Sequence, residues 1–81
     1  MNQKLKRINA IRNDRGQVRF DDACAVALEL EFTAQGGKGS HRVFARAGEA
    51  IGLTFQNRNG YIPNYQAQQL RDMIKLYWSE S

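Results

Sequence analysis

The sequence predicts an α+β fold class, with a three-stranded antiparallel sheet and helices packed on one of its faces. Apolar residues recur at helical spacing near both ends of the chain, whereas residues 31–56 alternate apolar with polar side chains, as half-buried strands do. The connections are short, which favours pairing of consecutive strands. With 81 residues, 42% hydrophobic and 25% charged, the chain has the size and composition of one folded unit.

The N-terminal residues are predicted to form a basic helix that precedes the α+β domain. Apolar side chains recur every three positions over residues 4–12, among several Lys and Arg, and Asn-Asp-Arg-Gly at residues 13–16 is a helix stop. We therefore divide the chain into a basic N-terminal helical extension, residues 1–20, and the α+β domain, residues 21–81.

Two further helices are predicted, one before the strands in the sequence and one after them. The first covers residues 23–30, with Asp21 or Asp22 as its N-cap, and is apolar nearly all round, so we expect it to be largely buried. The second covers residues 65–78, with Asn64 as its N-cap. Its apolar positions follow the spacing i, i+3, i+4, i+7, at Leu70, Met73, Ile74 and Tyr77.

The three strands are predicted between short connections rich in turn residues. They cover residues 31–35, 40–46 and 51–56. In the third strand Ile51, Leu53 and Phe55 are expected to share the buried face. Three glycines at residues 36–39 form the first loop, and Asn-Arg-Asn-Gly forms the turn after the third strand.

Charge and composition exclude several classes of protein. The net charge is +4, and basic stretches at residues 1–20 and 36–60 flank an acidic one, which suits a polyanion or an acidic protein partner, or merely a soluble surface. A single cysteine, Cys24, cannot form an internal disulfide. No apolar run approaches the roughly 20 residues of a membrane span, and the polar N-terminus is no signal peptide. We expect a cytoplasmic protein without membrane contact.

The stretch Gly-Gly-Lys-Gly-Ser-His-Arg, residues 36–42, concentrates the unusual chemistry of the chain. Glycines allow backbone N–H groups to approach an anion, and Lys38 and Arg42 add positive charge, so a phosphate site is one interpretation. A hairpin turn with ordinary surface charges is the other.

His41 is the single histidine of the chain. Neighbouring cations, Arg42 and Lys38, favour its neutral form, which can take a proton from a ribose 2′-hydroxyl. A surface or structural histidine is the alternative, and a nucleophilic pair with Cys24 is disfavoured because Cys24 lies within a helix expected to be buried. One histidine, one cysteine and scattered carboxylates give no metal-ligand spacing, so no metal or other cofactor is expected.

Aromatic residues near the C-terminus offer a second nucleic-acid signal. Tyr61, Tyr65, Tyr77 and Trp78 could each stack on a base. Helical spacing favours core packing for Tyr77 and leaves Tyr61 and Tyr65 open.

The run Gly-Ser-His-Arg-Val-Phe at residues 39–44, followed by a hairpin, a strand and an amphipathic helix, resembles the HicA family of small toxins. The resemblance covers about residues 22–77, and Gly39-Ser40-His41 matches the family's Gly-Ser-His motif. Leu53-Thr54-Phe55-Gln56-Asn57 and Pro63-Asn64-Tyr65-Gln66 are similar to a branch of the family with a polar turn between them.

The resemblance implies a fold like the double-stranded RNA-binding domain and metal-independent ribonuclease activity on mRNA, with neutralisation by a HicB-like antitoxin. It implies that His41 is catalytic and that Gly39 and Ser40 shape the loop. Four cations would then hold RNA phosphates: Lys38, Arg42, Arg46 and Arg58.

Two other classes of function fit the same sequence. The first is a non-catalytic module of this fold that binds RNA or a protein. The second is a structural component whose basic segments contact an acidic partner.

Overall fold

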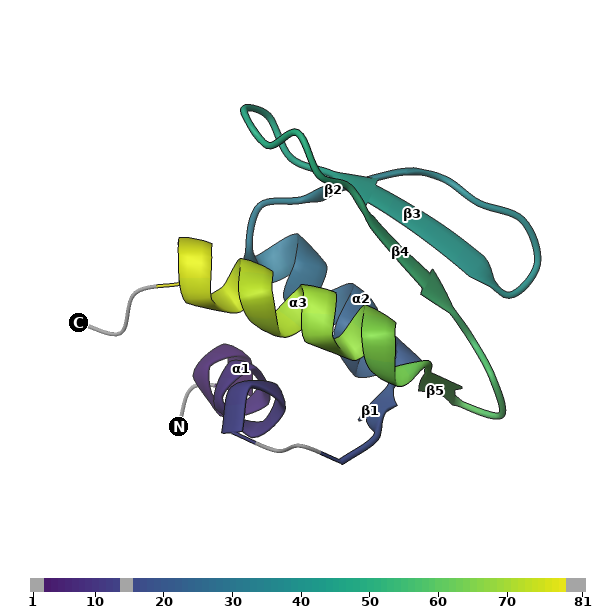
Figure 1. Ribbon diagram of the computed structural model, residues 1–81, viewed down its shortest axis with the longest axis horizontal. Helices are drawn as coiled ribbons and strands as arrows, with labels where there is room; N and C mark the ends of the chain where they lie inside the picture. Colours follow the sequence, from purple (N-terminus) through teal and green to yellow (C-terminus); the bar gives the residue numbers. More distant parts are fainter. Residues whose placement is uncertain (1–2, 14–15, 79–81) are drawn as a thin grey trace.

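The computed structural model describes residues 3–13 and 16–78, and Figure 1 shows their arrangement. The elements are α1 (Gln3–Asn13), β1 (Val18–Arg19), α2 (Phe20–Glu29), β2 (Thr33–Gly36), β3 (His41–Ala45), β4 (Leu53–Gln56), β5 (Tyr61–Ile62) and α3 (Asn64–Tyr77). Part of the predicted helix stop at residues 13–16 lies outside the described residues.

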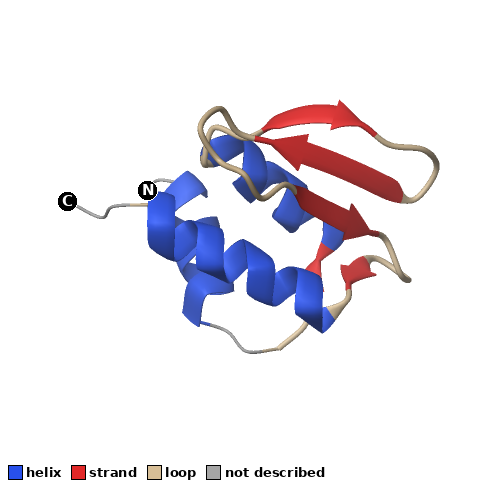
Figure 2. Cartoon of the chain, turned by 45° about the horizontal axis from the view of Figure 1, so that its top comes forward, coloured by secondary structure: helices blue, strands red, loops and turns tan. Residues whose placement is uncertain are grey.

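The main sheet has the strand order β2-β3-β4, and both pairs are antiparallel. Helices α2 and α3 cover one of its faces, and α1 lies on the far side of these two helices (Figures 1 and 2). The predicted α+β class, with a three-stranded sheet and helices on one face, is therefore confirmed. The order α2-β2-β3-β4-α3, with the two-residue β5 between β4 and α3, is compatible with a double-stranded-RNA-binding-domain-like arrangement.

The core forms between the sheet and the helices because the strands alternate as the sequence predicts. Phe44, Leu53 and Phe55 are buried on the helix side and belong to one core cluster with Leu70 and Ile74 of α3. The N-terminal extension belongs to the same core, through four buried side chains, Ile8, Ile11, Val18 and Phe20. Ile51, expected in the buried row, is 55% exposed because β4 begins only at Leu53.

Both predicted N-caps are wrong. Helix α2 begins at Phe20, so Asp21 and Asp22 lie within its first turn. Their negative charges stabilise the helix there, because they interact favourably with the positive end of the helix dipole. The early start follows from β1, which runs directly into the helix, and the N–H of Phe20 donates to the carbonyl oxygen of Gly60 at 2.9 Å. The same helix is expected from the sequence to be largely buried, because it is apolar nearly all round, but it is buried on one side only, and Leu28 is 55% exposed.

Helix α3 begins at Asn64, and Pro63 occupies the N-cap position. No side chain caps this end, because the proline side chain has no hydrogen-bonding atom, and the carbonyl oxygen of Pro63 accepts from the N–H groups of Gln66 and Ala67, both at 3.0 Å. The predicted amphipathic helix is otherwise confirmed, with Leu70, Met73 and Ile74 buried.

The sequence did not predict the short second sheet of β1 and β5. Val18 pairs with Ile62 and Arg19 with Tyr61, which ties the N-terminal extension to the segment before α3. The turn Arg58–Tyr61 leads into β5, and positive φ angles of 55° at Asn59 and 91° at Gly60 identify it as the Asn-Gly type of hairpin turn.

Candidate functional site

The side chain of His41 emerges on the open face of the sheet. His41 is opposite Gln56 in the β3–β4 ladder, and Phe44 is opposite Leu53. Opposed residues share a face and successive residues alternate. Since Phe44 and Leu53 are buried against the helices, His41 and Gln56 face away from them, and His41 is exposed.

Arg42 takes the other side of the same strand. It is opposite Phe55, whose side chain is fully buried on the helix side. Its Nη1 donates to the carbonyl oxygens of Gly39 at 3.1 Å and His41 at 3.0 Å, so its guanidinium braces the glycine-rich loop. The structure therefore separates Arg42 from the imidazole that it neighbours in sequence.

The glycine-rich loop is held tightly against the start of β3. The N–H of His41 donates to the carbonyl oxygen of Lys38 at 3.0 Å, which closes the turn. Gly37 has a φ of 133°, and a Cβ there would overlap the backbone carbonyl oxygen of His41. On the other side, the N–H of Asn57 donates to the carbonyl oxygen of Ser40 at 2.8 Å and extends the pairing of β3 with β4. These contacts fix the backbone from which the imidazole projects.

A cation from the turn after β4, Arg58, contacts the cross-strand partner of His41. The Nη2 of Arg58 donates to Oε1 of Gln56 at 3.1 Å, and Gln56 is the cross-strand partner of His41. We call His41, Gln56 and Arg58 the His41 cluster. His41 and Arg58 are among the site residues predicted from the sequence, whereas Gln56 is not, although the open-face alternation of β4 could have indicated it.

Gln66 supports this cluster from beneath. It is 4% exposed, and its Oε1 accepts from the backbone N–H of Gln56 at 2.8 Å. That N–H lies on the free side of β4, so Gln66 supplies the partner that a further strand would otherwise provide. The register of β4 beside His41 therefore depends on α3.

Arg46 is not brought to the site. It follows the last residue of β3, five positions from His41, which at strand rise is about 16 Å away. Its side chain donates to the carbonyl oxygen of Leu30 at 2.8 Å, forms an ion pair with Glu31 at 3.6 Å and lies 4.1 Å from the centre of the Tyr77 ring. These contacts give Arg46 a structural role.

The remaining sequence candidates fall outside the His41 cluster. Cys24 belongs to α2, which covers the face of the sheet opposite the imidazole, and burial raises the pKa of its thiol, with a smaller opposing effect of the Arg42 charge. Tyr77 packs against the core as predicted, whereas Tyr65 is 63% exposed. Among the described residues, no three His, Cys, Asp or Glu side chains gather as metal ligands would.

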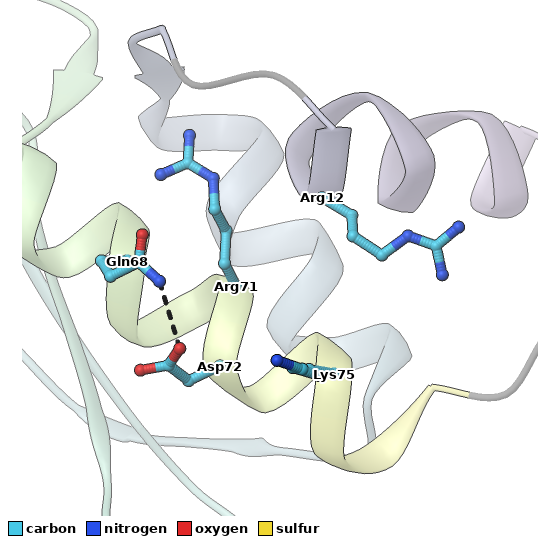
Figure 3. Close-up of a pocket in the computed structure, with 5 residues that line it drawn as sticks. All are labelled: Arg12, Gln68, Arg71, Asp72 and Lys75. Atoms are coloured by element: carbon cyan, nitrogen blue, oxygen red, sulfur yellow. Dashed lines mark hydrogen bonds between the residues drawn. The ribbon is translucent and has the colours of Figure 1, made fainter.

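A second group of cations lines a pocket of about 280 Å³ between α1 and α3 (Figure 3). Arg71, one of these cations, donates to the carbonyl oxygens of Ile11 at 3.0 Å and Gly16 at 3.2 Å, and thereby binds the end of α1 to α3. Asp72, which accepts from Gln68 at 3.1 Å, adds a negative charge to the same pocket. This pocket is therefore part of the packing of α1.

Within the described part of the chain, none of the helices has the length and apolar character needed to cross a membrane. Comparisons of the chain with protein-family models, with curated proteins and with solved structures find no match.

Proposed function

We propose that this chain is a cytoplasmic endoribonuclease of the HicA-like toxin type, which cleaves mRNA with a single catalytic histidine and is neutralised by a HicB-like antitoxin. The observation that carries the proposal is the placement of His41, exposed on the open sheet face and opposite Gln56, which Arg58 contacts at 3.1 Å. An RNA strand across this face would meet an imidazole and a guanidinium together.

The proposed reaction is transesterification at a phosphodiester. The neutral imidazole of His41 accepts the proton of the ribose 2′-hydroxyl, and the 2′-oxygen then bonds to phosphorus while the bond from phosphorus to the 5′-oxygen breaks. Water supplies the proton to the leaving 5′-oxygen. The products carry a 2′,3′-cyclic phosphate and a 5′-hydroxyl, and Arg58 stabilises the negative charge that develops on the phosphate oxygens.

The proposed RNA contacts divide into two groups. Lys38, Gly39 and Ser40 present charge and backbone groups in the loop before His41, and Arg58 holds the phosphate on the β4 side. Arg42 acts on the loop rather than on RNA, because its guanidinium is bonded to the carbonyl oxygens of Gly39 and His41.

Incubation of the purified protein with RNA in EDTA tests this function. We expect cleavage that leaves 2′,3′-cyclic phosphate ends, and a rate about 10²- to 10⁴-fold lower for His41→Ala, the usual contribution of a general base. DNA of the same sequence should stay intact, because it lacks the attacking hydroxyl. Lys75→Gln, which removes an exposed charge of α3, is the matched control and should cleave at the rate of the wild-type protein.

Two results contradict the proposal. Cleavage that persists in His41→Ala would assign the reaction to another group or to a contaminant. Intact RNA together with a mobility shift that weakens steeply with salt would instead support the non-catalytic RNA-binding module.

A further inference from the structure

We propose that a pocket adjoining the His41 cluster binds one unpaired nucleobase, which makes single-stranded RNA the substrate class of the site. The pocket has a volume of about 220 Å³. It is lined by residues from the segment before β1, the turn after β4, β5 and the start of α3: Gln17, Arg58, Tyr61, Ile62, Pro63 and Asn64. The inference rests on the proposed function for its substrate and on the pocket for its specificity.

The size and walls of the pocket suit a flat ring system. Sites for drug-sized ligands occupy roughly 300–1,000 Å³, so this smaller pocket fits a single base better than a whole cofactor. Tyr61 and Pro63 supply a ring and an apolar wall, and bases stack on such surfaces. Gln17 and Asn64 supply amide groups, each a donor and an acceptor, which can bond to the edge of a base.

The aromatic wall is held in place before any ligand binds. Tyr61 pairs with Arg19 in the β1–β5 ladder, and the Arg19 guanidinium lies 5.6 Å from the centre of the Tyr61 ring. The N–H and carbonyl groups of Tyr61 also bond to those of Arg58, at 3.1 Å and 2.7 Å, across the turn. A rigid ring loses little entropy when a base stacks on it.

Arg58 connects the pocket to the candidate catalytic group. It lines the pocket and also donates to Gln56, the cross-strand partner of His41. A nucleotide with its base against Tyr61 would therefore place a neighbouring phosphate at Arg58, on the path to the imidazole. A base in a duplex is stacked and paired, so only an unpaired strand can enter.

The experiment measures binding without cleavage. A fluorescently labelled single-stranded oligoribonucleotide is titrated with His41→Ala protein, and its anisotropy gives the affinity. We expect Tyr61→Leu to weaken binding about tenfold, the loss of one base–aromatic stack. Tyr61→Phe, which keeps the ring, should bind like its parent. Tyr65→Leu, which removes an exposed tyrosine that does not line the pocket, is the matched control and should also bind like its parent.

Two further measurements separate stacking from base readout. Gln17→Ala and Asn64→Ala should reduce the discrimination among oligonucleotides that differ at one base. Arg58→Gln should lower the slope of log affinity against log salt by about 0.7, which is the value for one phosphate contact on a single strand. Duplex RNA of the same sequence should compete poorly.

The result that overturns the pocket is equal affinity of the parent, Tyr61→Leu and Tyr65→Leu, or unchanged base preference in both amide variants. Absence of RNA binding overturns it as well. Failure of the proposed function gives a different result, in which RNA stays intact in the cleavage assay although binding still depends on Tyr61.

Discussion

At the scale of single residues, the structure separates three arginines that look equivalent in the sequence. Arg42 braces the loop before His41, Arg46 bonds to Leu30 and lies over Tyr77, and Arg58 lies beside the cross-strand partner of His41. Alternation along β3 turns Arg42 away from the imidazole, and the end of the strand carries Arg46 out of reach. Of these three arginines, the one bonded to the cross-strand partner of His41 therefore comes from the turn after β4, more than a dozen residues later in the chain.

Arg46 belongs to a polar cluster that closes the end of the sheet. The hydroxyl of Tyr77 donates to Glu49, whose other oxygen accepts from the N–H of Ile51 at 3.0 Å. The hydrogen bond from Tyr77 lowers the pKa of the Glu49 carboxyl most, and the bond from the N–H of Ile51 lowers it further. The same bond to Glu49 raises the pKa of the Tyr77 phenol. Each group is thus stabilised in the charge state that it has at neutral pH.

The cluster predicts a stability loss on both sides of neutral pH. Because folding lowers the pKa of Glu49, its carboxylate stabilises the folded state above the unfolded pKa, and this stabilisation is lost as the pH falls through the folded pKa. Because folding raises the pKa of Tyr77, its neutral phenol stabilises the folded state below the unfolded pKa, and this stabilisation is lost as the pH rises through the folded pKa. We expect the stability gap between wild type and Glu49→Gln, from urea unfolding, to shrink between about pH 7 and pH 3. A gap that stays constant over that range would contradict the assignment, and Tyr77→Phe should reduce the dependence at both ends.

At the scale of elements, the junction between α2 and β2 shows how the helix stops without a glycine. Glu31 has a φ of 69°, in the left-handed region. Its N–H donates to the carbonyl oxygen of Leu28 at 3.0 Å, and that of Phe32 donates to Ala27 at 3.0 Å, which is the pair of bonds that usually surrounds a C-terminal glycine. Burial of Phe32 against the core keeps this geometry despite its backbone cost.

This junction predicts a stabilising substitution. Glu31→Gly should raise the free energy of unfolding by about 1 kcal/mol, because glycine adopts the left-handed conformation without the penalty of a side chain. The ion pair with Arg46 that is lost is exposed on the glutamate side and weak. Glu31→Gln, which loses the same ion pair and keeps the strained backbone, is the control, and chemical denaturation of the three proteins measures the difference. Equal stability of the glycine and glutamine variants would show that the strain is absent.

At the scale of the whole molecule, the N-terminal extension and the sheet domain share one core. Ile8 of α1 is fully buried, and Arg7 bonds to Glu29 at the end of α2 at 2.8 Å. The pairing of β1 with β5 and the bonds from Arg71 to Ile11 and Gly16 attach the same segment at its other end. The β1 strand also brings Arg19 to Tyr61, so this segment helps to build the proposed base pocket.

This sharing predicts that the chain unfolds in a single step. Ile8→Ala should lower the free energy of unfolding by about 2–5 kcal/mol, the cost of a cavity in a core. Lys6→Ala, on the exposed side of the same helix, should change it by less than about 0.5 kcal/mol. Circular dichroism and the fluorescence of Trp78, the single tryptophan, should report one coincident transition in each protein. An early helical transition that leaves the fluorescence unchanged would show that α1 folds separately.

By itself, the sequence determined the parts of this protein that depend on local pattern. The spacing of Leu70, Met73 and Ile74 predicts α3, the alternation of Leu53 and Phe55 predicts β4, and the Asn-Gly pair predicts the turn before β5. The sequence likewise pointed to His41 as the residue of interest. Only the tertiary structure decided where the helices begin, which arginine contacts the cross-strand partner of His41, and that β1 pairs with β5. These outcomes depend on contacts between residues distant in the chain, such as Phe20 with Gly60 and Gln56 with Gln66, and no local pattern encodes them.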